Sequence, residues 1–207
     1  MDKIIRELHK AFNHFNETKF NNELIEPIIT IQSRPKTKKG NILGWCSCYP
    51  WWLEKHEDKE VYKYEINLTI ENINRPYEQL IHTLLHECCH LSNSLKGIND
   101  CSSRGNHNEN FKKEAERIGL IVEKAPRIGW SVTSLSESLL KEVQELDIDK
   151  SVFCLSKVVK PKEDKPRKPI LRYKYKCPSC GKELIGKDEN ISIECIDCRV
   201  EFVQVSK

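Results

Sequence analysis

The chain has 207 residues, of which 38% are hydrophobic, and it includes four tryptophans. This is enough apolar surface for a core, so the composition excludes a wholly disordered protein. No segment approaches the roughly 18 consecutive apolar residues of a membrane span, and the N-terminal MDKIIRELHKAF lacks the apolar stretch of a signal peptide. Without such signals, ten cysteines indicate metal ligands and buried thiols in a reducing compartment. We therefore expect a cytoplasmic protein without membrane contact.

Charge is unevenly distributed although the net charge is only +3. Residues 157–176 hold nine Lys/Arg against two Asp/Glu, whereas residues 177–207 hold four against six. The basic segment begins with KVVKPKEDKPRKPI (157–170), which contains three prolines and little to bury and is typical of a linker. We expect a core domain over 1–156, this basic linker over 157–170, and a small module over 171–207.

The first part of the core is predicted to be one helix followed by strands. Apolar residues recur at helical spacing over 2–19, which predicts an amphipathic helix. These apolar residues are Ile4, Ile5, Leu8, Phe12 and Phe15. IITIQS (28–33), NILGWCSC (41–48) and YKYEINLTI (62–70) are rich in β-branched and aromatic residues, which predicts strands. The intervening SRPKTKKG (33–40) contains proline and glycine and is predicted to be a loop.

Three further helices are predicted in the rest of the core. Pro76 suits the first turn of a helix whose apolar residues recur every three or four positions until shortly before Gly97. A polar loop, GINDCSSRGNHN, separates it from a second helix over about 108–118. Ser134 and Glu137 fit a capping box, which predicts the start of a third helix.

The stretch LLHECCHLSNSL, inside the first of these helices, carries His86 and His90. Residues four apart share one helix face, so both rings can bind one ion, and Glu87 lies beside that ion as a base. HExxH also occurs by chance on ordinary helices, and a hydrolytic zinc site needs a third protein ligand. His107 is the favoured third ligand because it begins the next helix, which would return close to the pair. His82 is a weaker alternative, because an ion held by the pair would lie too far from it.

Other cysteines and aromatic residues of the core are given structural roles. Two pairs of cysteines are predicted to be buried or half-buried thiols. They are Cys46, Cys48, Cys88 and Cys89. Trp45 is predicted to lie in the core, whereas Trp51 and Trp52 follow a proline and are candidates for an exposed groove that binds substrate or nucleic acid.

The segment PYEQLIHTLLHECCHLSNSLKGINDCSSRGNHNENFKKEAERIGL (76–120) resembles the SprT-like zinc metallopeptidase family, which includes the Spartan-type DNA–protein crosslink proteases. Family members carry HExxH on one helix and a third histidine on the next, followed four residues later by a phenylalanine. The matching residues are His86, Glu87, His90, His107 and Phe111. The resemblance extends over about 1–135 and then to the C-terminal module. Two positions depart from the family pattern, because Asn108 stands where a glycine is common and Cys88 where a methionine is common.

The resemblance implies an α+β, zincin-like core in which a small antiparallel sheet packs on helices. It implies a zinc metalloendopeptidase with zinc bound by His86, His90 and His107 and with Glu87 as the catalytic base for water attack on a peptide bond. The family's link to DNA implies that the substrates are proteins associated with DNA. The alternative is a non-catalytic, zinc-containing binding protein associated with nucleic acid or transcription. The intact Glu87 favours the enzyme.

The C-terminal module has its own cysteine framework. CPSCG (177–181) and CIDC (195–198) are two CxxC pairs separated by fourteen residues, a spacing typical of a structural zinc ribbon. The predicted ligands are Cys177, Cys180, Cys195 and Cys198, which bring the expected number of zinc ions to two, one catalytic and one structural. ISIEC and VEFVQV are predicted to be its strands, and a redox role for the CxxC pairs is the weaker alternative.

A basic and aromatic stretch precedes these cysteines. It consists of Arg172, Tyr173, Lys174, Tyr175 and Lys176. Rings that alternate with cations suit stacking and phosphate contacts with DNA, but a solvated basic segment that enters a strand explains the pattern equally well. The family resemblance favours binding, and it implies a protein substrate and DNA as partners, with a nucleoid location if DNA is bound, while the oligomeric state stays open.

Overall fold

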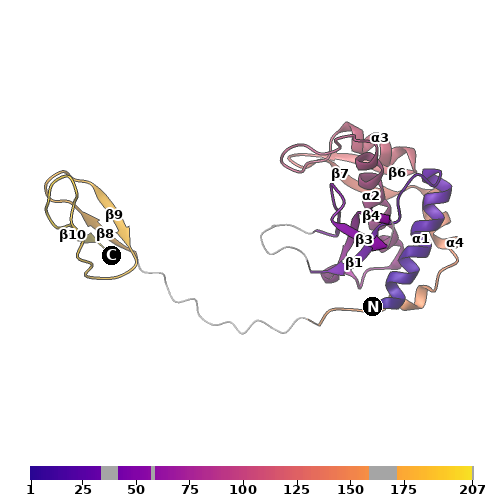
Figure 1. The fold of residues 1–207 in the computed structure, drawn as a ribbon, viewed down its shortest axis with the longest axis horizontal. Coiled ribbons are helices and arrows are strands. Elements are labelled where there is room, and N and C mark those ends of the chain that lie inside the picture. Colours follow the sequence, from indigo (N-terminus) through magenta and orange to yellow (C-terminus); the bar gives the residue numbers. More distant parts are fainter. Residues whose placement is uncertain (34–41, 57–58, 159–171, 207) are drawn as a thin grey trace. The chain divides into compact units, whose positions relative to one another are not determined.

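The structure is a computed structural model, and its chain divides into two compact units, Met1–Val159 and Lys160–Lys207 (Figure 1). The described residues are 1–33, 42–56, 59–158 and 172–206. The predicted loop at 33–40 and the predicted linker at 157–170 lie almost entirely outside them, so both stay predictions. In the described ranges the N-terminal unit is a mixed α+β domain with four α-helices and small sheets.

The elements of the N-terminal unit follow one another in chain order. They are α1 (Asp2–Phe20), β1 (Ile28–Gln32), β2 (Gly44–Cys46), β3 (Trp52–His56), β4 (Lys59–Lys63), β5 (Glu65–Thr69), the 3₁₀ turn η1 (Ile70–Asn72), α2 (Tyr77–Leu95), α3 (Glu109–Arg117), β6 (Leu120–Ala125), β7 (Gly129–Leu135), α4 (Glu137–Glu145) and the 3₁₀ turn η2 (Lys150–Val152).

The central sheet has the strand order β1-β5-β2. β1 pairs with β5 in parallel and β2 pairs with β5 antiparallel, so the sheet is mixed and the expected antiparallel sheet is wrong. The single strand predicted over 62–70 is in fact two. Its first two residues belong to β4, which forms a separate hairpin with β3, and residues 65–69 form β5. Strand propensity indicates an extended backbone but carries no information about which strands pair or in which direction.

The apolar core lies between this sheet and the helices α1 and α2. Ile66 and Leu68 on β5 are fully buried in it. The predicted apolar face of α1 is confirmed, because four of its five residues are buried and Ile5 is half-buried. The four are Ile4, Leu8, Phe12 and Phe15. α4 is joined to α1 at the surface, where Lys19 and His14 both contact the carboxylate of Glu142.

The residues of β5 that alternate with Ile66 and Leu68 are polar and also buried. Glu65 accepts hydrogen bonds from the Trp52 indole Nε1 at 2.8 Å and from the Thr30 hydroxyl at 3.1 Å. Asn67 accepts one from the same hydroxyl at 2.9 Å. β5 is therefore covered on both faces, and its second face is held by hydrogen bonds.

The predicted helices of the HExxH region are close to the observed ones. α2 has Pro76 as its N-cap and ends before Gly97. α3 has Asn108 as its N-cap, whose side chain accepts hydrogen bonds from the backbone N–H groups of Asn110 and Phe111. A capping amide satisfies helix N–H groups that a glycine would leave to water. Asn108, which departs from the family pattern, therefore acts here as a helix cap.

The antiparallel hairpin of β6 and β7 was not among the predicted elements. Its strand β7 includes Ser134, so the predicted capping box is wrong by two residues. The observed N-cap of α4 is Ser136, whose hydroxyl accepts from the backbone N–H of Leu139. Ser134 instead pairs across the hairpin with Ile121. Backbone pairing with the neighbouring strand β6 has outweighed the local capping signal.

The C-terminal unit has one three-stranded sheet with the order β10-β8-β9. Its strands are β8 (Tyr173–Lys176), β9 (Glu183–Gly186) and β10 (Val203–Ser206). β10 overlaps the second half of the predicted VEFVQV (200–205), but ISIEC is not a strand and contributes only a bridge between Glu194 and Glu201. Across the described part of the chain, no helix is long and apolar enough to cross a membrane.

We expect Phe12→Ala to lower the free energy of unfolding of the N-terminal unit by about 3–5 kcal/mol, because it leaves a cavity in a fully buried site. Urea denaturation followed by circular dichroism measures this change. Leu140→Ala on α4, where the side chain is partly exposed, is the matched control and should cost well under half as much. A loss below about 1 kcal/mol for Phe12→Ala would contradict the assigned core.

Candidate metal centre

The three predicted histidines meet at one point. α2 supplies His86 and His90 one turn apart, and His107 lies just before α3. One ligand nitrogen from each ring lies within 4.8 Å of the others. The ring centroids are 4.8–5.2 Å apart. Figure 1 shows how α2 and α3, which are separated by a loop, come together in this region.

Hydrogen bonds occupy the outward-facing nitrogens of the two helical histidines. His90 Nδ1 lies 2.7 Å from Asp100 Oδ2, and His86 Nδ1 lies 3.1 Å from the Thr133 hydroxyl. Each contact occupies Nδ1, so Nε2 is the nitrogen left to bind an ion. Metal-bound histidines typically use their second nitrogen in this way, with a carboxylate or hydroxyl that fixes the ring orientation.

His107 is positioned through its backbone. It bridges Cys101 on one side and Gly129 on the other, and its carbonyl accepts a hydrogen bond from the Trp130 N–H at 3.1 Å. Gly129 has φ +72°, and a Cβ there would lie 2.3 Å from the His107 carbonyl oxygen. Only glycine allows the hairpin to approach this closely. The ring rests on Phe111, with 4.1 Å between the two centroids.

Burial keeps two of the rings neutral. It lowers the pKa of His107 to about 4, aided by the charge of His90. It also lowers the pKa of His86 well below its usual value. Burial acts in the same direction on His90, but the hydrogen bond to Asp100 and the charge of Glu87 outweigh it and raise the pKa of that ring. Neutral imidazoles have the free lone pair that a metal ion needs.

The donor set fits a zinc ion. Three imidazoles leave one position of a tetrahedral ion open, as in catalytic zinc sites. Among the described residues, the buried Nδ1 of His107 has no hydrogen-bond partner. The same three residues also form one of the groups whose ligand atoms are close enough to share an ion. Zinc binding by these residues stays a prediction that this geometry supports.

Glu87 is on α2, and its carboxylate lies next to strand β2. It is 5% exposed, and a Cβ on Gly44 would come within 3.1 Å of its Oε1. Burial raises the pKa of Glu87 to about 7, against the opposing effects of His90 and of a backbone hydrogen bond from Cys46. The carboxylate is thus desolvated, feels the charge of His90, and can bind a proton near neutral pH.

A family model, that of the SprT-like family, matches residues 8–133. The chain belongs to the SprT-like family. The matched region runs from α1 to β7 and includes the three histidines and Glu87. No curated protein and no solved structure shows significant similarity to the chain.

Several other residues that the sequence of this SprT-like protein singled out lie outside the histidine group. His82 donates to or accepts from the Thr133 hydroxyl at 2.9 Å and is not part of the histidine group. Cys88 and Cys89 are buried, as predicted, and burial raises the pKa of both thiols. Asp100 and Thr133, which contact His90 and His86, were missed because one is in a polar loop and the other on a strand that was not predicted.

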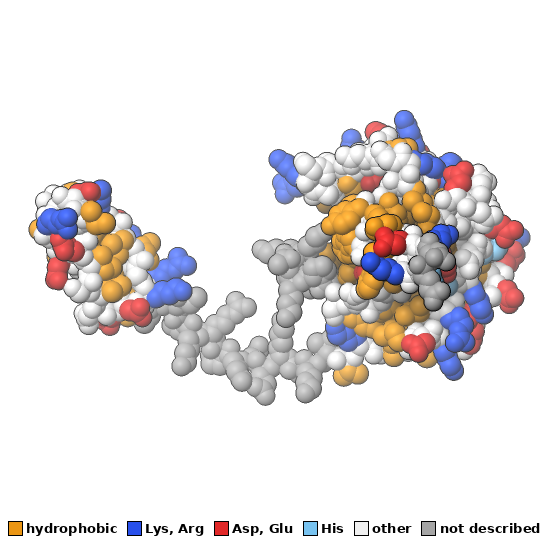
Figure 2. Space-filling model, viewed as in Figure 1, with side chains coloured by type: hydrophobic (Ala, Val, Ile, Leu, Met, Phe, Trp, Pro, Cys, Tyr) orange, Lys and Arg blue, Asp and Glu red, His pale blue; other side chains and the backbone are white. Residues whose placement is uncertain are grey.

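Exposed aromatic side chains cluster around the β3–β4 hairpin. Trp51 and Trp52 are 52% and 45% exposed, which confirms their predicted exposure, and Tyr49 is 63% exposed. Figure 2 shows hydrophobic side chains on the face of the N-terminal unit where β3 and β4 lie in Figure 1. Trp45 is half-buried and not in the core, and Cys48 is exposed, so the expectation of a buried or half-buried thiol there is wrong. The half-buried Cys46 fits that expectation.

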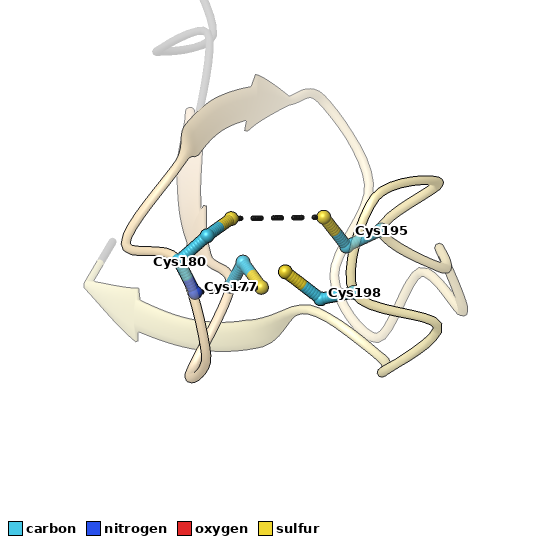
Figure 3. A group of neighbouring side chains, drawn as sticks. All are labelled: Cys177, Cys180, Cys195 and Cys198. Atoms are coloured by element: carbon cyan, nitrogen blue, oxygen red, sulfur yellow. Dashed lines mark hydrogen bonds between the residues drawn. The ribbon is translucent and has the colours of Figure 1, made fainter.

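The four cysteines of the C-terminal unit converge, as Figure 3 shows. They are Cys177, Cys180, Cys195 and Cys198. Both CxxC pairs close in the same way, with Gly181 (φ +76°) donating to the Cys177 carbonyl and Arg199 (φ +56°) to the Cys195 carbonyl. The Cys180 backbone N–H lowers the pKa of Cys177 to about 7, which favours the thiolate. The cluster is compatible with a zinc ribbon.

The predicted stacking role of the tyrosines on β8 is wrong. Tyr173 and Tyr175 are 5% and 1% exposed, and the Tyr175 hydroxyl donates to the Asp188 carbonyl at 2.7 Å. Alternate residues of a strand face opposite sides, so the cations Arg172, Lys174 and Lys176 are the exposed ones. Only these cations remain candidates for contacts with phosphates.

We expect Gly129→Ala to weaken zinc binding at the histidine group and to destabilise the N-terminal unit by about 2 kcal/mol, because the methyl group would displace the His107 backbone. Zinc content after dialysis and urea denaturation measure the two effects. Gly105→Ala is the matched control, since Gly105 also has a positive φ of +78° but open space around it. Equal zinc affinity in the two variants would show that the close approach does not matter.

We expect removal of metal by a chelator to unfold the C-terminal unit and to leave the N-terminal unit folded. A module of this size has too little apolar surface to fold without its ion. Backbone amide NMR signals of residues 172–206 should collapse to random-coil positions, whereas those of α1 and β5 should persist. Dispersed signals from the C-terminal unit in metal-free protein would contradict a structural metal.

Proposed function

We propose that the chain is a zinc metalloendopeptidase with a zincin-like core. The observation that carries the proposal is the buried Glu87 carboxylate, which lies beside three converging histidines in a member of the SprT-like family. A scaffold that only held an ion would not need a desolvated base next to an open coordination position. A zinc ion bound there would supply Lewis acidity, which lowers the pKa of water and polarises a carbonyl group.

Two residues of the protein have separate roles in this reaction, proton transfer for Glu87 and ligand orientation for Asp100. Glu87 accepts a proton from the attacking water and holds it on its carboxylate, where burial makes the protonated form accessible. It next gives this proton to the leaving amine nitrogen. Asp100 keeps the His90 ring oriented through the Nδ1 hydrogen bond, so that Nε2 stays directed at the centre.

The sheet offers a place for the substrate backbone. In the described part of the chain β2 is an edge strand, paired only with β5, and it runs past Glu87. An extended peptide can pair with such an edge through main-chain hydrogen bonds. This arrangement would bring a peptide carbonyl to the histidine group without any requirement for a particular side chain.

We further propose that the substrates are proteins associated with DNA, as expected of DNA–protein crosslink proteases. The exposed cations Arg172, Lys174 and Lys176 support contact with phosphates, and the exposed Trp51 and Trp52 support contact with bases or with unfolded protein. The same exposed cations beside a four-cysteine cluster favour the second candidate, a non-catalytic zinc protein that binds nucleic acid.

We expect Glu87→Gln to keep the zinc of the wild type and to lower the rate of casein cleavage by about 100-fold or more, because the amide cannot take up the proton. Zinc content per chain and cleavage with and without DNA, measured on the same samples, test this. Glu109→Gln, at an exposed position on α3, is the control. Cleavage that survives Glu87→Gln would exclude Glu87 as the base.

His107→Ala separates the enzyme from the binding protein. We expect one zinc fewer per chain and no cleavage, since two imidazoles hold zinc far more weakly than three. Unchanged zinc content, together with an inactive wild type, would mean that only the cysteine cluster holds metal. The binding-protein alternative would then replace the peptidase.

A further inference from the structure

One hydroxyl group connects two histidines of α2. The Thr133 side chain on β7 lies 3.1 Å from His86 Nδ1 and 2.9 Å from His82 Nε2. His82 and His86 are four residues apart and therefore lie on the same helix face. All three side chains are half-buried, so water competes little for these contacts.

The direction of these hydrogen bonds follows from what His86 must do. To offer Nε2 to an ion, a neutral ring carries its hydrogen on Nδ1 and donates it to Thr133. The threonine hydroxyl has one hydrogen of its own, and His82 Nε2 is placed to accept it. His82 remains neutral and able to accept, since burial and the charge of Arg75 lower its pKa to about 4.

The second helical ligand has a different kind of partner. His90 is backed by the carboxylate of Asp100, which can only accept and so fixes the Nδ1–H form unaided. A hydroxyl both donates and accepts, so it fixes the same form of His86 only if its own hydrogen is directed elsewhere. His82 supplies that acceptor.

We propose that Thr133 is a positioning residue that fixes the tautomer and the ring orientation of His86, and that His82 orients the Thr133 hydroxyl. This inference rests on the metal centre of the proposed function. It assigns a role to the hairpin, because β7 then holds two of the three ligands, His86 through Thr133 and His107 through the Trp130 backbone.

The test is zinc affinity in the full chain. Thr133→Val keeps the shape of the side chain and removes the hydroxyl, and we expect the affinity of the histidine group for zinc to fall about 10- to 100-fold. Thr133→Ser keeps the hydroxyl and should stay within about threefold of the wild type. Ser134→Ala, the exposed neighbour on β7, is the control and should change nothing. Chelator competition gives the affinities, and the cysteine cluster serves as the internal reference.

A double-mutant cycle tests the part played by His82. We expect His82→Phe to weaken zinc binding in the wild type but to have little further effect in the Thr133→Val background, because the hydroxyl that it orients is already gone. Additive losses would overturn the assignment of His82.

Nitrogen NMR of the zinc-loaded protein tests the assigned hydrogen-bond directions. It should show the His86 hydrogen on Nδ1, and a hydrogen on Nε2 would overturn them.

The remaining outcomes separate this inference from the proposed function. If the wild type binds no zinc at the histidine group, the peptidase itself is wrong. If the wild type binds zinc and Thr133→Val binds it equally well, only the positioning role is wrong. If Thr133→Ser loses as much affinity as Thr133→Val, the effect comes from packing and the positioning role is again wrong.

Discussion

The site depends on one physical constraint, which is that a buried imidazole needs a partner at each nitrogen. Three such rings share one centre, and none of them has a covalent link to the others. Asp100 and Thr133 satisfy the outward nitrogens of His90 and His86, so only nitrogens that can bind an ion face inward. Burial lowers the pKa of His86 and His107, and the neutral rings that result are compatible with binding a cation.

The β6–β7 hairpin holds His107, the one histidine of the group that is not on α2. Two residues on one helix turn are aligned by helix geometry, but a third ligand from another segment must be brought to them and held. Gly129 and Trp130 fix the His107 backbone, and Phe111 supports its ring. The C-terminal unit also brings candidate ligands together from separate segments, here four thiols on two short turns. A bound ion would provide the stability that a larger domain gains from its apolar core.

Patterns read along the chain predicted the elements whose determinants are local. The amphipathic helix at the N-terminus, α2 with His86, Glu87 and His90, and the two CxxC turns all follow from spacing within a few residues. His107 was identified as the third ligand from its place before a helix, and the structure brings it to the pair. The tyrosines of β8 show the limit of such patterns, because alternation alone does not reveal which side of a strand is buried.

Tertiary pairing decided the rest. The parallel alignment of β1 with β5, the packing of the β6–β7 hairpin against α2 and α3, and the positions of Asp100 and Thr133 depend on contacts that form only in the folded chain. Ser134 shows this most directly, since pairing with Ile121 overrides its local fit as a helix cap. Side-chain spacing predicts which residues share a face, whereas contacts between distant segments depend on the packing of the whole unit. The candidate ligands were therefore visible in the sequence, and the groups that contact them, Asp100 and Thr133, were visible only in the fold.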